Sequence, residues 1–184
     1  MRLFVALDLP DAVRPLLAAW RPYVPGARWV PAERLHLTLR FLGETTSDRM
    51  NAITDQIQNL KAGAILVETG DLLRLPSARR PRALTVRVAE TPALGALAAR
   101  LGAALARAGA PPADHDLLPH VTLARFRHPD PAAIRKALRG LEPPHARGLA
   151  TSISLVESRQ TPEGPVYETR LRVPLAETPT RDGG

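Results

Sequence analysis

Two periods of hydrophobic and polar positions recur along the chain, and together they predict a mixed α+β fold. Strand-like runs cover residues 2–9, 35–42, 65–68, 83–89, 119–126, 152–157 and 166–173, and a short extended piece surrounds Trp29. Apolar residues at helical spacing follow a capping residue four times, after Asp11, Ser47, Thr91 and Asp130. Residues 142–149 predict a loop, and the residues from Pro174 onward predict a frayed tail.

The order of these predicted elements repeats. Strand, helix, histidine-bearing strand, helix and strand follow one another in about residues 1–75 and again in about residues 82–173. The next helix cap comes 11 residues after His36 in the first copy and 10 residues after His120 in the second. A repeat of this kind predicts two similar lobes related by a pseudo-twofold axis, each with an antiparallel sheet and helices.

We therefore expect one bilobal domain over residues 1–175, with the active site in the cleft between the lobes, and a disordered tail over residues 176–184. No apolar run reaches the roughly 18 to 20 residues that a membrane span needs. The N-terminal run is short and meets Pro10-Asp11, unlike a signal peptide. These features predict a cytoplasmic protein without a membrane anchor, and we expect a monomer.

Each histidine-bearing strand carries a histidine and a threonine two positions apart. They are His36 and Thr38 in the first copy and His120 and Thr122 in the second, with leucine or valine between and after them. Because side chains alternate along a strand, each His–Thr pair lies on one face and the aliphatic residues on the other. One such pair alone is typical of a half-buried sheet face, whereas two pairs at matching places indicate a site.

Two imidazoles and two hydroxyls around one phosphorus suit phosphodiester cleavage. A neutral imidazole takes a proton from the nucleophile, an imidazolium gives one to the leaving oxygen, and the hydroxyls donate to phosphate oxygens. Arg125 lies five residues after His120, so an ideal strand would point it to the opposite face. A bulge would return it to the site, where it would bind the oxygens that become negative in the transition state.

Composition adds two constraints. The chain has no cysteine, which excludes disulfides, thiolate nucleophiles and thiolate-bound zinc. The net charge is +7, and of 25 Lys and Arg residues only Lys61 and Lys136 are lysine, which leaves 23 arginines. Guanidinium groups favour anionic partners, although a coding bias explains an arginine excess equally well.

The sequence resembles the 2H phosphoesterases, in particular the bacterial and archaeal RNA 2′,3′-cyclic phosphodiesterases, historically called 2′-5′ RNA ligases. The two His-x-Thr motifs carry the resemblance, with support from residues 2–10, 40–43, 155–158 and 164–168, so that it covers nearly the whole chain. It implies a bilobal α+β fold, no metal or cofactor, and hydrolysis of a 2′,3′-cyclic phosphate to a 2′-phosphate, with reversible 2′-5′ ligation as a side activity.

The resemblance also implies roles. His36 matches the proton donor to the leaving 3′ oxygen and His120 the proton acceptor that activates water. Thr38 and Thr122 match the phosphate-binding threonines, and Arg125 matches a basic residue that follows the second motif. From the residues themselves the site is nearly symmetric, and the acid and base are not distinguished.

Other features leave alternatives open. Phe4, Phe41, Trp29 and Tyr167 are candidates to stack a terminal base; Tyr167 is favoured for its hydroxyl, and core packing is favoured for Phe41. The arginine-rich residues 74–82 predict either an RNA backbone contact or a solvated connector. His115 between two aspartates is better explained as a solvated loop than as a metal site, because no second cluster of ligands accompanies it.

The expected partners are RNA ends or nucleotides that carry a 2′,3′-cyclic phosphate. Two other functions stay open: an RNA-end binding module without turnover, and a 2H phosphodiesterase acting on a small cyclic nucleotide or an oligoadenylate. No Gly-rich phosphate loop occurs, which argues against an ATP-dependent ligase.

Overall fold

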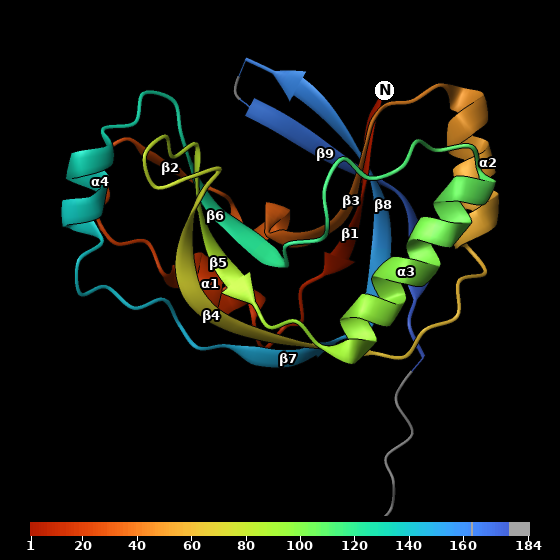
Figure 1. Cartoon of the computed structure of the whole chain (residues 1–184), viewed down its shortest axis with the longest axis horizontal. Helices are drawn as coiled ribbons and strands as arrows, with labels where there is room; N and C mark the ends of the chain where they lie inside the picture. Colours follow the sequence, from red (N-terminus) through yellow and green to blue (C-terminus); the bar gives the residue numbers. More distant parts are fainter. Residues whose placement is uncertain (163, 177–184) are drawn as a thin grey trace, which may run out of the picture.

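The computed structural model describes residues 1–162 and 164–176. Its elements lie in an order close to the predicted one (Figure 1). The strands are β1 (Arg2–Asp8), β2 (Ala27–Trp29), β3 (His36–Glu44), β4 (Ile65–Leu75), β5 (Ala83–Val88), β6 (His120–Phe126), β7 (Arg147–Ala150), β8 (Ser152–Thr161) and β9 (Gly164–Pro174). The helices are α1 (Arg14–Ala19), α2 (Ser47–Ile57), α3 (Pro92–Arg107) and α4 (Pro131–Ala137), with a 3₁₀ turn η1 (Ala32–Arg34).

The strands of the described residues form one nine-stranded antiparallel sheet, and all except β2 follow one another along a single path. Its order is β7-β4-β5-β6-β3-β1-β8-β9, and β2 pairs with β6 beside β3. The predicted α+β fold with antiparallel strands is therefore confirmed, and the strands form one large sheet. The path crosses between the two repeats, because β4 of the first half pairs with β5 of the second. The bilobal division at residues 75–82 stays a prediction.

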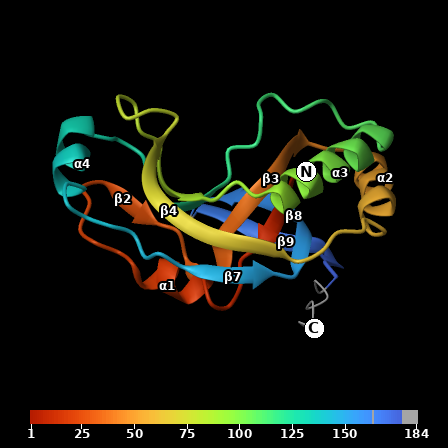
Figure 2. The same cartoon turned by 60° about the horizontal axis from the view of Figure 1, so that its bottom comes forward.

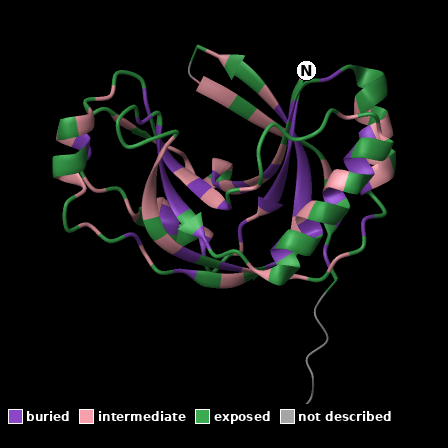
Figure 3. Cartoon of the chain, in the orientation of Figure 1, coloured by how far each residue is buried: buried purple, intermediate pink, exposed green. Residues whose placement is uncertain are grey.

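One face of the sheet packs on helices. Leu37 and Val121, the central residues of the two motifs, are fully buried in the main core, which also holds the apolar residues of α2 and α3. A second cluster joins Ala124 and Phe126 of β6 to Ile134 of α4. Figure 2 shows α3 and α2 together on one side of the strands. The exposed and buried stripes of α3 in Figure 3 follow the predicted leucine spacing.

Several predicted boundaries are wrong for local reasons. Residues 142–149 are not all loop, because Arg147 to Ala150 form β7, which pairs with β4. Gly148 permits this strand, since a Cβ there would lie 2.9 Å from the Cβ of Pro10. The cap of α2 is Thr46, whose hydroxyl accepts from the Arg49 amide, rather than Ser47.

Two further predictions, of the start of the first helix and of the end of the last strand, are also wrong. Asp11 does not cap α1, which begins after Val13 without a side-chain cap. Pro174 does not begin a frayed tail, since Leu175 is buried and Ala176 exchanges backbone hydrogen bonds with the segment Ala62 to Ala64. The rest of the predicted tail, residues 177–184, lies outside the described residues.

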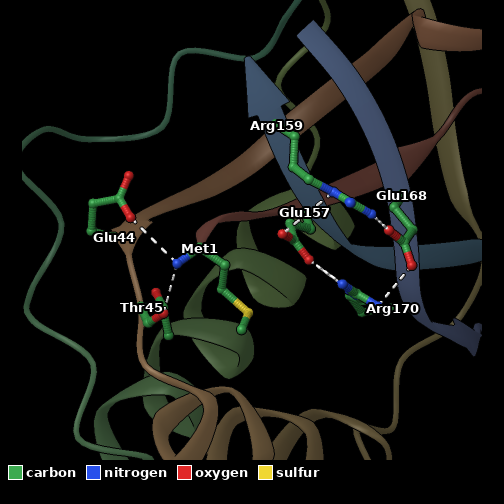
Figure 4. A network of polar contacts seen from close by, with 7 residues as sticks. All are labelled: Met1, Glu44, Thr45, Glu157, Arg159, Glu168 and Arg170. Atoms are coloured by element: carbon green, nitrogen blue, oxygen red, sulfur yellow. Dashed lines mark hydrogen bonds and ion pairs between the residues drawn. The ribbon is translucent and has the colours of Figure 1, made fainter. Parts of the chain in front are cut away.

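The β8–β9 hairpin is longer than predicted and carries a polar network on one side (Figure 4). Arg170 donates to both Glu157 and Glu168, and Arg159 pairs with the same two carboxylates. The hydrogen bond from Arg170 lowers the pKa of Glu157 and raises the pKa of Arg170 itself. This network joins the two strands of the hairpin on the side away from the histidines.

No helix among the described residues is both long and apolar enough to cross a membrane.

Candidate active site

The two motif strands are antiparallel neighbours whose paired residues are Leu37 and Val121. Extending this register by one residue sets His36 across from Thr122 and Thr38 across from His120. Side chains of cross-strand neighbours lie on the same face, so the four polar residues surround one point on the face opposite the main core. We call this the histidine face. The two motif strands thus contact each other directly at the pair Leu37 and Val121, and the predicted cleft between two lobes stays a prediction.

Both imidazoles are held in the same way. The Nδ1 of His36 lies 2.7 Å from the carbonyl oxygen of Arg34, and the Nδ1 of His120 lies 2.6 Å from that of Leu118, in each case two residues earlier. A carbonyl only accepts, so Nδ1 carries a hydrogen in both rings. Nε2 is therefore the atom that gains or loses a proton, and in His36 it lies 3.0 Å from the Thr38 Oγ1. The carbonyl contacts have no sequence signal.

An aromatic cluster supports His36. Phe4 stacks against its ring, with centroids 4.8 Å apart, and Tyr167 meets the ring edge-on at 5.6 Å. Phe4 is only 4% exposed and packs with Ala6 and Val156. The predicted base contact at Phe4 is therefore not supported by its position, because the ring lies beneath His36. Tyr167 is half-buried beside it, and its contact with a base stays a prediction.

Burial and nearby cations lower the pKa of His36. Desolvation is the largest cause, and the charges of Arg125 and Arg14 act in the same direction. The Arg34 carbonyl and the carboxylate of Asp8 raise the pKa but do not outweigh burial. Asp8 is the register partner of His36, and its carboxylate accepts hydrogen bonds from two serine hydroxyls of β8. In the ligand-free protein His36 is thus more easily neutral than an ordinary histidine.

This lowered pKa predicts a loss of stability in mild acid. The unfolded chain binds the His36 proton at about pH 6.5, whereas the folded chain binds it only at a lower pH. Between the two values the unfolded state holds more protons, so the free energy of unfolding should fall as the pH drops below about 6.5. Urea unfolding between pH 5 and 8 measures this. In His36→Gln the fall should be smaller, and an equal fall in both proteins would contradict the assignment.

A bulge brings Arg125 to the histidine face. Thr85 of β5 pairs with Thr122 and the preceding Leu84 pairs with Ala124, so Leu123 has no partner. Leu123 and Ala124 are both buried, and beyond them alternation resumes with an exposed Arg125 between two core residues. The side chain therefore lies on the face of His120 despite its odd spacing. Its electrostatic effect on the pKa of His36 agrees with this position.

The first motif contains a matching bulge. Ala6 of β1 pairs with Thr38 and the preceding Val5 pairs with Arg40, which leaves Leu39 without a partner. Phe41, five residues after His36, then returns to the histidine face, where its ring centroid lies 6.1 Å from that of Phe4. Phe41 is 69% exposed, so the predicted core packing is wrong. A bulge thus places the cation Arg125 on the histidine face in the second copy and the exposed ring of Phe41 there in the first.

The other candidates lie outside this cluster. Residues 76–80 form an exposed turn between β4 and β5 that ends close to Arg125, because Ala83 is its register partner. Trp29 packs edge-on against Trp20. His115 is exposed, and within the described ranges no three His, Cys, Asp or Glu residues are grouped as metal ligands would be.

Comparison with known proteins agrees with this geometry. Residues 9–162 match the family model described as the 2′-5′ RNA ligase superfamily. An RNA 2′,3′-cyclic phosphodiesterase of Thermus thermophilus is 37% identical over 186 residues, covering 91% of this chain and 86% of the relative. One of Archaeoglobus fulgidus is 28% identical over 177 residues, covering 94% and 99%.

A crystal structure of Escherichia coli LigT complexed with 3′-AMP aligns with a TM-score of 0.74 at 26% identity, covering 95% of this chain and 97% of LigT. The family model alone spans well over half of the sequence, from the residue after β1 to the end of β8. The chain therefore belongs to the 2′-5′ RNA ligase superfamily, as its paired motifs indicated.

Proposed function

We propose that this protein hydrolyses 2′,3′-cyclic phosphate ends of RNA to 2′-phosphate ends by histidine acid–base catalysis, without a metal. One observation carries the proposal. The Nδ1 atoms of His36 and His120 each contact a carbonyl, which leaves both Nε2 atoms for proton transfer, and the His36 Nε2 lies beside the Thr38 hydroxyl. Relatives named for this activity cover most of the chain and support the choice of substrate.

In the proposed reaction His120 Nε2 takes a proton from water as the water oxygen attacks phosphorus. The bond from phosphorus to the 3′ oxygen breaks, and His36 Nε2 gives its proton to that oxygen. Thr38 and Thr122 donate hydrogen bonds to non-bridging oxygens, and Arg125 stabilises the charge that develops on them. Burial works against a charged His36 in the free protein, whereas a bound phosphate anion would favour its protonation.

Three finer expectations accompany this proposal. A 5′-hydroxyl in place of water would join RNA ends by a 2′-5′ bond, because its oxygen would attack phosphorus, give its proton to His120 and displace the same 3′ oxygen, and this exchange is reversible. The exposed ring of Phe41 is a better candidate for stacking a base than the buried ring of Phe4. Tyr167 is the second candidate. Action as a monomer in the cytoplasm stays a prediction from the sequence.

Product analysis on an RNA oligonucleotide with a 2′,3′-cyclic phosphate end tests the proposal. With EDTA present, we expect complete conversion to the 2′-phosphate and no 3′-phosphate. Tight binding without any product would support the RNA-end binding module instead. Turnover of a small cyclic nucleotide or an oligoadenylate in preference to the oligonucleotide would assign a different substrate to the same site.

A further inference from the structure

Arg28 is the direct cross-strand neighbour of Arg125. The short strand β2 pairs with the end of β6, and the register sets Ala27 against Phe126, Arg28 against Arg125 and Trp29 against Ala124. Phe126 and Ala124 belong to the helix-packed core. Since residues in direct register share a face, Arg28 extends from the histidine face together with Arg125.

This juxtaposition is electrostatically unfavourable without a ligand. Like charges directly opposite each other on a sheet destabilise it. Within residues 1–162 and 164–176 neither Arg28 nor Arg125 forms an ion pair with a carboxylate, although five other arginines of the chain do. Both side chains are exposed. Two adjacent free guanidinium groups favour an anion with several oxygens, such as a phosphodiester.

The position of Arg28 relative to the motifs suggests which phosphate it contacts. Along one edge of β6 the partner is first β3, at Val121, and then β2, from Ala124 to Phe126. Arg125 lies three residues past Thr122 along β6, and Arg28 lies level with it, one strand spacing, about 4.8 Å, away on the β3 side of β6. Both arginines are displaced along the strands from the four motif residues. A second phosphate of the same chain would therefore reach Arg28 while the cyclic phosphate occupies the motifs.

The turn between β4 and β5 extends the positive region on the other edge of β6, across Arg125 from Arg28. The two strands close the turn at the pair Leu75 and Ala83, and Ala83 is in turn the register partner of Arg125. Arg79 and Arg80 at the tip are exposed. Figure 1 shows this turn reaching past β5 on the side of the molecule where β2 lies.

We propose that Arg28 binds the phosphodiester next to the terminal cyclic phosphate, so that the substrate is an oligonucleotide end rather than a free nucleotide. The inference rests on the proposed function and narrows its substrate class.

Kinetics on two substrates test this inference. We expect Arg28→Ala to lower kcat/KM about tenfold for an oligonucleotide ending in a 2′,3′-cyclic phosphate, and to leave kcat/KM unchanged for a nucleoside 2′,3′-cyclic phosphate that has no second phosphate. Arg135→Ala is the matched control, because Arg135 is an exposed arginine of α4, which packs on the opposite face. An equal loss on both substrates, or no loss on either, would overturn the inference.

A binding measurement decides the inference separately from turnover. The probe is a fluorescent RNA oligonucleotide with a 2′-phosphate end, titrated at several salt concentrations. Loss of one phosphate contact in Arg28→Ala should reduce the slope of log affinity against log salt by about 0.7, with Arg135→Ala unchanged. If the slopes of wild type and Arg28→Ala differ as expected but wild type hydrolyses neither the oligonucleotide nor the nucleoside 2′,3′-cyclic phosphate, the proposed function fails and the Arg28 subsite stands. An unchanged slope overturns the subsite.

Discussion

His36→Ala and His120→Ala should each lower kcat/KM on a nucleoside 2′,3′-cyclic phosphate by about 10³- to 10⁴-fold, because general acid or base catalysis contributes about 10²- to 10⁴-fold for each group. The effect should be near the upper limit for both. The two Nε2 atoms are the proton-transfer atoms of a site whose remaining polar groups are hydroxyls. Initial rates in EDTA measure it, and full activity in either variant would rule out the mechanism.

The same two variants distinguish acid from base when the leaving group is changed. A nucleoside p-nitrophenyl phosphodiester releases an anion that needs no proton, so it bypasses the general acid. If His36 is the acid, His36→Ala should regain most of the wild-type rate on this ester, whereas His120→Ala should stay as impaired as on the cyclic phosphate. The opposite pattern would exchange the two roles. Thermal unfolding of both variants checks that they remain folded.

The expected asymmetry between the histidines begins with their surroundings. Both rings have the same carbonyl contact, so the backbone does not distinguish them. His36 alone stacks on Phe4 and meets Tyr167, and its burial lowers its pKa. An acid with a lowered pKa is uncharged in much of the free protein at neutral pH. The negative charge of the bound phosphate must then raise the pKa of His36 so that the ring takes up a proton. Substrate binding is therefore part of the activation of His36.

Alternation along the chain predicted which residues would meet, because period-2 patterns determine the face of each side chain. His36, Thr38, His120 and Thr122 lie on one face for that reason, and Leu37 and Val121 are buried on the other. Helical spacing in α3 similarly predicted its buried leucines. These features depend on local sequence alone.

The remaining features depend on pairing between distant segments. The strand β7 forms where β4 offers an edge, within a Pro- and Gly-rich segment that has no alternation of its own. The direct contact of β3 with β6 follows from the order of strands in the sheet. The positions of Phe41 and Arg125 depend on an extra residue in each motif strand, Leu39 and Leu123, and a leucine in a strand gives no sequence signal that it forms a bulge.

Arg125 is where such a bulge has the greatest expected consequence for catalysis. Without the unpaired Leu123, strand alternation would bury the Arg125 guanidinium in the cluster of Ala124 and Phe126. The site would then lack the cation that acts most strongly on His36. We expect Arg125→Ala to lower kcat by about 10²- to 10³-fold, the range for losing one preorganised donor to transition-state charge. Arg125→Lys should recover only part of the rate, because an ammonium cannot donate bidentately.

A second readout separates this role from a structural one. The positive charge of Arg125 lowers the pKa of His36, so Arg125→Ala should raise that pKa toward its ordinary value in an NMR titration of the ligand-free protein. The matched control is again Arg135→Ala, which removes the same charge from α4 on the opposite face and should change neither kcat nor the His36 titration. A variant that loses activity while the His36 pKa stays fixed would mean that Arg125 acts on the fold rather than on the phosphate site. Wild-type activity with an unmoved pKa would mean that the bulge does not bring this side chain to the histidines at all.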